Sequence, residues 1–432
     1  MTFQAALEQI DQSPRVTLAA AQLELAQEQL NVSASWLQTE LTGGYTLRSN
    51  RSSIPDEAGM TEAFGEGSGV DPISLNAIFN VVPYGPRYDQ TQQQRFNVER
   101  ARATLRSERA AVTIDVTEQY QTALRAGQQV ALSEAQLELR ELLLEAERTR
   151  LGAGTATTGD VLEAEIATQE ALQALLDAER NELQAFAALT TTLGVEVREV
   201  ADDLPTSSFE TEVSEALLEQ RSEITDARLG LAEAELTAAS TLRENLPSGT
   251  LDTGFNSSTN SSTLQLGAQY SLGGPNAYQP TLSFSIDPDT GVQEIPEGED
   301  VQSFSVGVGV SIPLDVALND ALDAARLNVE QSQLRLEQAL TLARLEVSNT
   351  QAAVATAEAN IDLAEQVLEQ RQQTVQTSQQ RLELGLVSPL DVQQATVSVQ
   401  EAELTLVQAR DALRLAHMRL ASALALDPLE VF

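Results

Sequence analysis

The sequence has no cysteine, no lysine and only one histidine, His417, so most of the side chains that enzymes use are missing. Without cysteine the chain has no disulfide, no thiolate metal site and no lipid-modified N-terminal cysteine. A P-loop needs its lysine, so the stretch Gly152-Ala153-Gly154 does not form one. No nucleophile–base pair or metal cluster can be assembled from a single histidine, and we predict no enzyme activity, no cofactor and no metal site.

Positive charge is also scarce. The 26 basic residues are all arginine and stand against 64 acidic residues, which gives a formal net charge of −38. Such a surface repels phosphate backbones, and this argues against nucleic acid as a partner. Aromatic residues make up only 4% of the chain, whereas Ala, Leu, Gln and Glu fill long stretches. That composition is typical of long helices and coiled coils.

Long apolar runs are absent as well. None approaches the roughly 18 residues of a membrane-spanning helix. The start, Met1-Thr2-Phe3-Gln4, lacks the basic region and apolar core of a signal peptide. Two explanations remain open: the protein is cytosolic, or the sequence begins at the mature end of an exported protein. The patterns below favour the second explanation.

The chain contains an internal repeat with an offset of 231 residues, and the match extends over about a hundred residues without a gap. The motif Arg-Leu-x-x-Gly, followed by Asp-Val, occurs once in each copy. Its residues are Arg150, Leu151, Gly154, Asp160 and Val161 in the first copy, and Arg381, Leu382, Gly385, Asp391 and Val392 in the second. We therefore expect a duplicated structural unit, with repeats over residues 1–200 and 201–432.

Each repeat carries heptads, which make helices supercoil around partners. The spacing of seven links Val130, Leu137, Leu144 and Leu151, and likewise Ile361, Leu368, Val375 and Leu382. The segments 154–159 and 385–390 break the helical pattern, so each pair of helices must fold back. Elsewhere apolar residues alternate with small or polar ones, as in Phe304 to Ile312, which predicts strands with one apolar face.

Together these patterns predict a mainly α fold with a β-barrel portion. For the first repeat we expect a helix over 15–36, strands at about 37–48 and 73–83, and a helical hairpin over 88–195. For the second we expect a helix over 213–246, strands at about 248–272 and 301–313, and a hairpin over 316–426. Four strands per chain cannot close a membrane barrel alone, because about eight is the usual minimum. The strands therefore belong to a barrel shared by several chains, or to a small soluble subdomain that caps the coiled coil.

In this order and in two copies, the motifs resemble the TolC-type outer membrane efflux protein family over nearly the whole chain. Further matching segments are Arg221-Ser222-Glu223-Ile224, which opens the second repeat, and Ser13-Pro14-Arg15-Val16, which opens the first. The resemblance implies a homotrimer in which each chain gives four strands to one twelve-stranded barrel in outer membrane lipid, while the duplicated coiled-coil hairpins form a tunnel in the periplasm. It also implies two partners, a periplasmic adaptor (membrane fusion) protein and an inner-membrane pump.

The same resemblance implies two sets of site residues at the hairpin tips. The periplasmic aperture would involve Asp391 and Asp160, with Gln394 at a position where one family member has a second acid. Adaptor docking would involve Arg150, Leu151, Gly154, Arg381, Leu382, Gly385, Leu386 and Val387. From the residues alone, Asp160 and Asp391 are equally well explained as helix N-terminal acids that the helix dipole favours. His417 is better explained as a packed or surface residue than as a ligand.

The predicted function is an outer membrane channel-tunnel that conducts substrates passively in a tripartite efflux or type I secretion system. A structural coiled-coil spacer of the cell envelope, without a conducting lumen, is the alternative. The strands separate the two, because a spacer has no need of two-faced strands attached to a duplicated hairpin. The identity of the substrate is left open.

Overall fold

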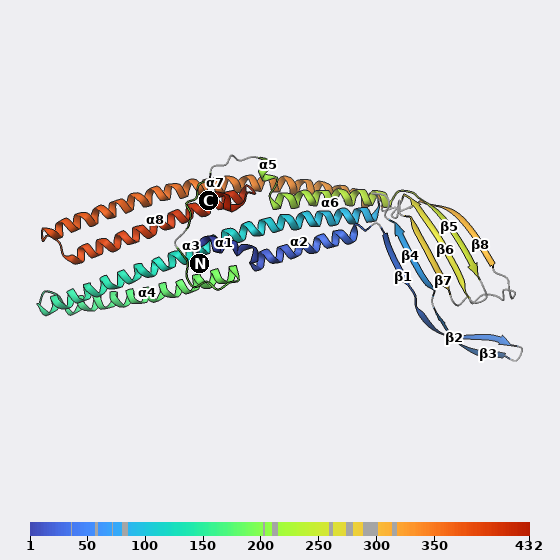
Figure 1. Ribbon diagram of the computed structural model, residues 1–432, viewed down its shortest axis with the longest axis horizontal. Helices are drawn as coiled ribbons and strands as arrows, with labels where there is room; N and C mark the ends of the chain where they lie inside the picture. The colour runs from blue at the N-terminus through green and yellow to red at the C-terminus, as the bar shows by residue number, and fades with distance from the viewer. Residues whose placement is uncertain are drawn as a thin grey trace. The chain divides into compact units, whose positions relative to one another are not determined.

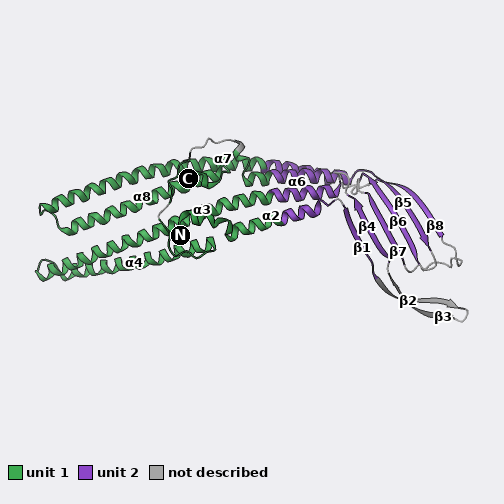
Figure 2. Ribbon diagram, viewed as in Figure 1, with its two compact units in different colours: residues 1–24, 100–227, 336–432 green, residues 25–99, 228–335 purple. Residues whose placement is uncertain are grey.

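The computed structural model describes residues 1–35, 37–56, 59–70, 72–79, 85–201, 204–209, 215–258, 262–273, 280–287, 301–312 and 318–432. These residues form two compact units, which Figure 2 shows in different colours. The first comprises residues 1–24, 100–227 and 336–432, and the second comprises residues 25–99 and 228–335. Each unit therefore combines segments from both halves of the chain.

Two long helical hairpins account for most of the described residues (Figure 1). In the first, α3 (Pro86–Gly152) is followed by α4 (Thr158–Leu193), and in the second, α7 (Leu318–Glu383) is followed by α8 (Pro389–Ala423). Corresponding bounds differ by 230 to 232 residues, as the sequence offset predicts. At a rise of ~1.5 Å per residue, α3 and α7 are each about 100 Å long.

Shorter helices precede each hairpin. The first repeat has α1 (Phe3–Glu8), a 3₁₀ turn (Ile10–Gln12) and α2 (Pro14–Ser33). The second has α5 (Glu215–Leu218) and α6 (Ser222–Glu244), and a last 3₁₀ turn, Pro428–Val431, follows α8. The expected helix over 213–246 is thus interrupted, because the N–H groups of Gln220 and Arg221 bond three residues back, to Leu217 and Leu218, and close a turn. Residues 213–214 lie outside the described part.

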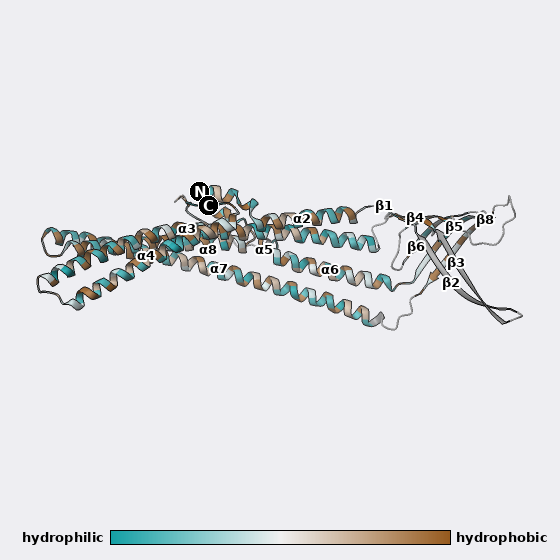
Figure 3. Cartoon of the chain, turned by 90° about the horizontal axis from the view of Figure 1, so that it is seen from below, coloured by the Kyte–Doolittle hydropathy of each residue, from teal (hydrophilic) through white to brown (hydrophobic). Residues whose placement is uncertain are grey.

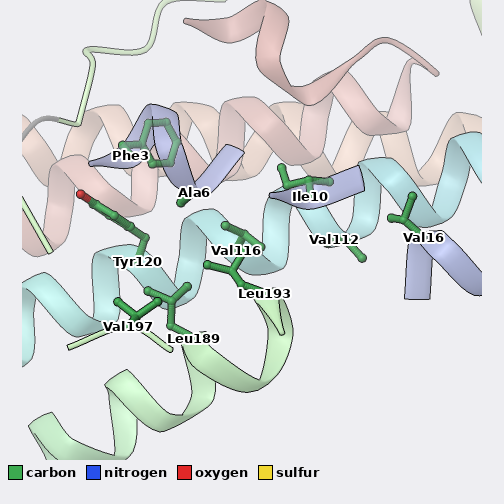
Figure 4. Packing of buried hydrophobic residues seen from close by; sticks show 10 residues of the cluster. All are labelled: Phe3, Ala6, Ile10, Val16, Val112, Val116, Tyr120, Leu189, Leu193 and Val197. Atoms are coloured by element: carbon green, nitrogen blue, oxygen red, sulfur yellow. The ribbon is translucent and has the colours of Figure 1, made fainter. Parts of the chain in front are cut away.

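The apolar core of the first unit lies where the chain start packs on the first hairpin (Figure 4). Tyr120 is fully buried, and its hydroxyl oxygen lies 3.0 and 2.7 Å from the carbonyl oxygens of Met1 and Ala201, which share its single proton. Phe3 meets the Tyr120 ring edge-on, with ring centroids 5.4 Å apart. Around this pair the cluster contains Ala6, Ile10, Val16, Val112, Val116, Leu189, Leu193 and Val197.

A second core in the same unit repeats this arrangement with other residues. Its members include Ala343, Val347, Leu420 and Leu424, which lie 231 residues after Val112, Val116, Leu189 and Leu193. Leu218 and Ile224 take the places of Ile10 and Val16. The duplication therefore extends from helix bounds to individual buried side chains.

The strands belong to the second unit. A six-stranded antiparallel sheet has the order β1-β4-β7-β6-β5-β8, and β2 and β3 form a separate two-stranded sheet. Their bounds are β1 (Leu37–Thr42), β2 (Tyr45–Asp56), β3 (Gly59–Val70), β4 (Ile73–Phe79), β5 (Ser248–Ser258), β6 (Thr263–Leu272), β7 (Thr281–Asp287) and β8 (Val301–Ser311). The predicted fold class, mainly helical with a sheet portion, is confirmed.

The strand count differs from the expectation of four. The range 248–272 contains two strands, β5 and β6, which turn back on one another and pair from Gly249 with Leu272 to Ser258 with Thr263. The segment 273–300, which lies between two predicted strands, contains β7, and the segment 48–72 between the first two predicted strands contains most of β2 and all of β3. The predicted residues 80–83, 313 and 316–317 lie outside the described part. The prediction of a single strand over 248–272 is wrong, because alternation by itself does not show where a chain reverses.

Among the described residues, none of the helices is long and apolar enough to cross a membrane. Figure 3 shows the reason, because hydrophilic and hydrophobic residues alternate along each of the long helices.

Candidate functional site

The first hairpin tip ends in a glycine turn that satisfies the last carbonyl groups of α3. Gly154 has a φ of +77°, and its N–H donates to the carbonyl oxygen of Leu151 at 3.0 Å. The next N–H, of Thr155, donates to the carbonyl oxygen of Arg150 at 2.9 Å. This pair of bonds is the Schellman motif, which places a residue in the left-handed region after the helix.

The second tip has the same backbone. Gly385 has a φ of +68°, its N–H donates to Leu382 at 2.9 Å, and the N–H of Leu386 donates to Arg381 at 2.8 Å. A Cβ added at either glycine meets no atom within 4 Å, so space does not require glycine there. The positive φ requires it. The turn therefore explains the glycine of the repeated Arg-Leu-x-x-Gly motif. The Arg and Leu of the motif contribute their carbonyl oxygens to the turn, and this role does not depend on their side chains.

Each returning helix starts with a capping box. The Thr157 hydroxyl accepts from the N–H of Asp160 at 3.2 Å, and the Asp160 carboxylate accepts from the N–H of Thr157 at 2.7 Å. Ser388 and Asp391 repeat these contacts at 3.3 and 2.7 Å. The pKa values of Asp160 and Asp391 lie below the usual value. The main cause is the hydrogen bond from the backbone N–H of Thr157 or Ser388, and the second is the hydrogen bond from its hydroxyl. Both carboxylates therefore have a defined structural role within one chain.

Although their backbones agree, the two tips display different side chains. Leu384 and Leu386 on the second tip are 74% and 70% exposed. The matching residues on the first tip are Ala153 and Thr155, which are also exposed. Large apolar side chains are left in water within the turn of the second tip, whereas the exposed Leu162 near the first tip lies on α4, and leucines exposed in a turn favour a partner that contacts it.

Charged side chains surround the first tip. Arg150 is exposed and pairs with Glu147 at 2.6 Å, and Arg148 pairs with Glu165 at 2.7 Å. A cavity of about 370 Å³ lies between α3 and α4 at this tip. It is lined by Arg140, Leu143, Glu147, Arg150, Asp160, Glu163, Ala164 and Ala167.

The other predicted site residues lie at the second tip. Arg381 is exposed, Leu382 and Val387 are half-buried, and Gln394 is exposed on α8 three residues after Asp391. The two tips belong to different hairpins, so Asp160 and Asp391 are placed by separate capping boxes.

The six-stranded sheet has two chemically distinct faces. Alternate side chains of a strand point to opposite faces. The pairing register places apolar residues beside apolar residues, and small or polar residues beside one another, from one strand to the next. Phe304 pairs with Phe255, Phe255 with Leu266, Leu266 with Phe284, and Phe284 with Leu75. All of these residues line one depression of about 460 Å³ on the sheet, together with Leu282 and Ala77.

The opposite face carries small and polar residues. Ser305 pairs with Gly254, Ser283 with Gly267, and Gly309 with Thr250. A Cβ added at Gly254, Gly267 or Gly309 would lie 2.8, 2.5 or 2.6 Å from the partner hydroxyl, so the hydroxyls occupy the space above the glycines. This face is therefore lined by short polar groups, which suits contact with water.

Each edge strand of the sheet is paired on one side within the part of the chain that the structure describes. Among these residues β8 pairs only with β5, and β1 pairs only with β4. On β8 the apolar face is open, with Val308 79% and Val310 74% exposed. An exposed, apolar edge strand of this length is a template for pairing with another chain.

Sequence reasoning missed several of these features. The alternation of Leu282, Phe284 and Ile286 marks β7 and could have revealed it. Arg221 is 8% exposed and is held by Glu346 at 2.5 Å, by Glu223 and by the carbonyl oxygen of Ala423, a burial for which the sequence offers no signal.

The single histidine takes part in packing. His417 is 5% exposed, and its Nδ1 lies 3.1 Å from the Ser207 hydroxyl. Burial lowers the pKa of its imidazole, against the opposing charge of Glu358. The expectation of a packed or surface residue agrees with this position.

The sequence pattern of outer membrane efflux proteins matches residues 6–195 and 213–426, and the chain therefore belongs to the outer membrane efflux protein family. The family resemblance predicted from the motifs is confirmed. No curated protein matches the chain in the sequence comparison.

Solved structures with the same fold include a membrane protein from Pseudomonas aeruginosa, which is 18% identical with a TM-score of 0.70 and aligns over 98% of this chain and 93% of its own. The outer membrane protein VceC from Vibrio cholerae is 20% identical, with a TM-score of 0.67 and coverage of 98% and 95%. The MtrE outer membrane channel of Neisseria gonorrhoeae, solved in an open state, is 16% identical with a TM-score of 0.64 and coverage of 98% and 89%.

Proposed function

We propose that the protein is the outer membrane channel-tunnel of a tripartite efflux or type I secretion system, in which it conducts substrates passively to the exterior. Membership of the outer membrane efflux protein family supports the location and the transport role. The observation that carries the proposal is the six-stranded sheet, which has one apolar face, one polar face and, among the described residues, a strand with a free side at each edge. A wall with these properties separates lipid from water when its edges are joined.

Joining the edges requires further copies of the chain. The sheet is antiparallel throughout and has an even number of strands, so its edge strands β1 and β8 run in opposite directions. β8 of one copy can then pair with β1 of the next in the same antiparallel pattern, and cyclic symmetry closes the barrel. We propose three copies, as the family resemblance implies, with the helical hairpins forming a tunnel in the periplasm.

The hairpin tips are the proposed contact with the periplasmic adaptor. The docking surface comprises the two glycine turns with their flanking residues Arg150, Leu151, Gly154, Arg381, Leu382, Gly385, Leu386 and Val387. The exposure of Leu386 supports this assignment for the second tip. At the same end, Asp391, Asp160 and Gln394 of three copies would surround the periplasmic aperture.

A coiled-coil spacer without a lumen is the rival function. The heptads suit both functions, but a spacer gives no reason for the row from Phe304 through Phe255 and Leu266 to Leu75 on one face of the sheet. The channel explains both faces of the sheet.

The test is the mass and the conductance of the purified protein. In mild detergent we expect a mass of three chains, and in a planar bilayer we expect discrete conductance steps. As a control, Val308→Glu places a charge on the proposed lipid face and should reduce membrane insertion. A stable monomer that needs no detergent and conducts no ions would show that the protein is not a channel.

A further inference from the structure

We infer that each chain contributes six strands to the membrane wall, so that three copies close an eighteen-stranded barrel with a lumen of porin-like width. The hairpin formed by β6 and β7 provides the two additional strands. The inference rests on the proposed function, because it takes the edges of three copies to be joined.

Both strands of this hairpin reach the end of the sheet from which the helices leave. The Gly273 Cβ position lies 2.7 Å from the carbonyl oxygen of Pro247, the residue just before β5, and φ at Gly273 is +74°. Gly273, directly after β6, therefore packs against the chain leaving α6. At the start of β7, the carbonyl oxygen of Pro280 accepts from the N–H of Phe79, the last residue of β4, at 2.9 Å.

The same strands also reach the opposite end. Thr263, the first residue of β6, pairs with Ser258, the last residue of β5, and with Asp287, the last residue of β7. Ile286 of β7 pairs with Ile73, the first residue of β4. β6 and β7 therefore run the full height of the sheet, which a surface loop does not do.

The two faces continue across the inserted strands. Leu266 and Phe284 carry the apolar face from Phe255 on β5 to Leu75 on β4. On the other face, Ser283 of β7 pairs with Gly267 of β6 and with Asn76 of β4. A hairpin folded over one face of a wall would interrupt this pattern, whereas strands within the wall must obey it.

Within the described part of the six-stranded sheet, β6 and β7 come from the second repeat, and the first repeat supplies β1 and β4. Residues 34–85 separate α2 from α3, and residues 245–317 separate α6 from α7. Inserting one whole hairpin adds one strand in each direction, so β1 and β8 still run in opposite directions and the edges still join.

The barrel width follows from the strand number. With strands ~4.8 Å apart and tilted by about 40°, eighteen strands give a backbone diameter of about 36 Å and twelve give about 24 Å. Barrels of about 16 to 18 strands enclose an aqueous channel. The barrel is then too wide to set the size limit for cargo, and the limit belongs to the helical part.

Removing the inserted hairpin tests the inference. Deletion of residues 259–287 joins Ser258 to Pro288 and leaves β1, β4, β5 and β8, in which β4 and β5 run in opposite directions. We expect trimers whose barrel is narrower by about a third, as measured by electron microscopy of the full-length protein in detergent and by exclusion of neutral polymers added from the barrel side. The matched control is deletion of residues 45–70, which removes β2 and β3 but no strand of the six-stranded sheet, and should leave the diameter unchanged.

A second measurement does not depend on the folding of a deletion variant. Because the chain has no cysteine, Asn76→Cys with Ser283→Cys introduces a single pair at register partners of β4 and β7. We expect this pair to cross-link within one chain in isolated membranes. Asn76→Cys with Ser305→Cys, on strands that are not neighbours, should not cross-link within the chain.

The outcomes separate this inference from the proposed function. A conducting trimer with twelve strands, or a deletion variant with the wild-type diameter, overturns the inference and leaves the channel intact. Two copies that close twelve strands also overturn it. A protein that neither inserts nor conducts removes the proposed function. Formation of the cross-link between positions 76 and 283, together with three copies, supports eighteen strands.

Discussion

The two repeats of the chain agree in their helices and differ in their strands. Both hairpins have a Schellman turn closed by glycine, a capping box with aspartate and matching core positions such as Leu193 and Leu424. The strand segments differ. In addition to β1 and β4, the first repeat carries β2 and β3, which form a separate sheet, whereas the second repeat carries β6 and β7 in addition to β5 and β8, all in one sheet. Local backbone requirements at the turns and caps determine the helical part. A whole hairpin can be added to a sheet, by contrast, without reversing the direction of the strands on either side of it.

The largest expected effect tests whether the two cores are equivalent. Leu193→Ala and Leu424→Ala each remove a side chain that is at most 1% exposed. Each should lower the free energy of unfolding by about 2–5 kcal/mol, because a cavity adds to the lost transfer energy. Urea unfolding followed by circular dichroism measures both, with exposed Leu183→Ala on α4 as the control. Losses that differ more than twofold between the cores would contradict their equivalence.

The next effect concerns the tip glycines. Gly385→Val places a β-branched residue at a φ of +68°, at a local cost of about 2 kcal/mol. We expect impaired export and adaptor cross-linking while the trimer stays folded, because only the tip turn changes. Gly154→Val, at +77°, strains the first tip equally and should impair export less, since Ala153 and Thr155 stand in that turn where the second has Leu384 and Leu386. If export and cross-linking both survive Gly385→Val, the docking assignment is wrong.

Much of the helical architecture could be predicted because it follows from local sequence. The repeated Arg-Leu-x-x-Gly motif located both turns, and Asp160 and Asp391 marked the helix starts within two or three residues. β6 lies within the predicted strand 248–272, but β7 was missed although Leu282, Phe284 and Ile286 alternate, because pairing between distant strands decides whether such a segment joins a sheet. The burial of Arg221 and the packing of Phe3 depend on contacts with residues more than a hundred positions away.

A smaller effect tests the helix starts. Ser388→Ala should lower the local stability of α8 by about 1 kcal/mol, and Thr157→Ala should do the same for α4. The capping hydrogen bonds lower the pKa of Asp391, so the stabilisation they give is present above the ordinary aspartate pKa and is lost as the pH falls through the lowered value. Nuclear magnetic resonance titration of the Asp391 carboxyl should show its pKa moving up in Ser388→Ala. An unchanged pKa would mean that the box does not form in solution.

The ends of the returning helices provide a reciprocal test. Gly194 has a φ of +73°, and Ala425, 231 residues later, has a φ of +59°. Among the described residues, Ala425 is the one residue other than glycine with a positive φ. Ala425→Gly should raise stability by roughly 0.5–1 kcal/mol, because the relief of strain exceeds the entropy cost of glycine. Gly194→Ala should lower it by a similar amount, with a Cβ that meets only Pro14 at 3.9 Å. Thermal unfolding measures both, and equal signs would contradict the equivalence of the two helix ends.

The last prediction changes no core contact and separates the two explanations of Asp391. In the proposed trimer, three copies of this carboxylate meet at the aperture, where a low-dielectric wall strengthens their field. Such a ring attracts cations, and the like charges would raise one another's pKa against the lowering by Ser388. We expect a cation-selective pore that multivalent cations block from the periplasmic side, and Asp391→Asn should weaken both properties.

Ser388→Ala is the decisive companion to Asp391→Asn, because it weakens the capping box but keeps the charge. If the ring acts through charge, Ser388→Ala retains selectivity while Asp391→Asn loses it, and Glu163→Gln on the exposed flank of α4 changes little. Reversal potentials under a salt gradient in a planar bilayer measure the selectivity. It should fall toward molar salt, where the Debye length shrinks to about 3 Å. An anion-selective pore, or one that Asp391→Asn leaves unchanged, would mean that Asp391 serves only to cap α8.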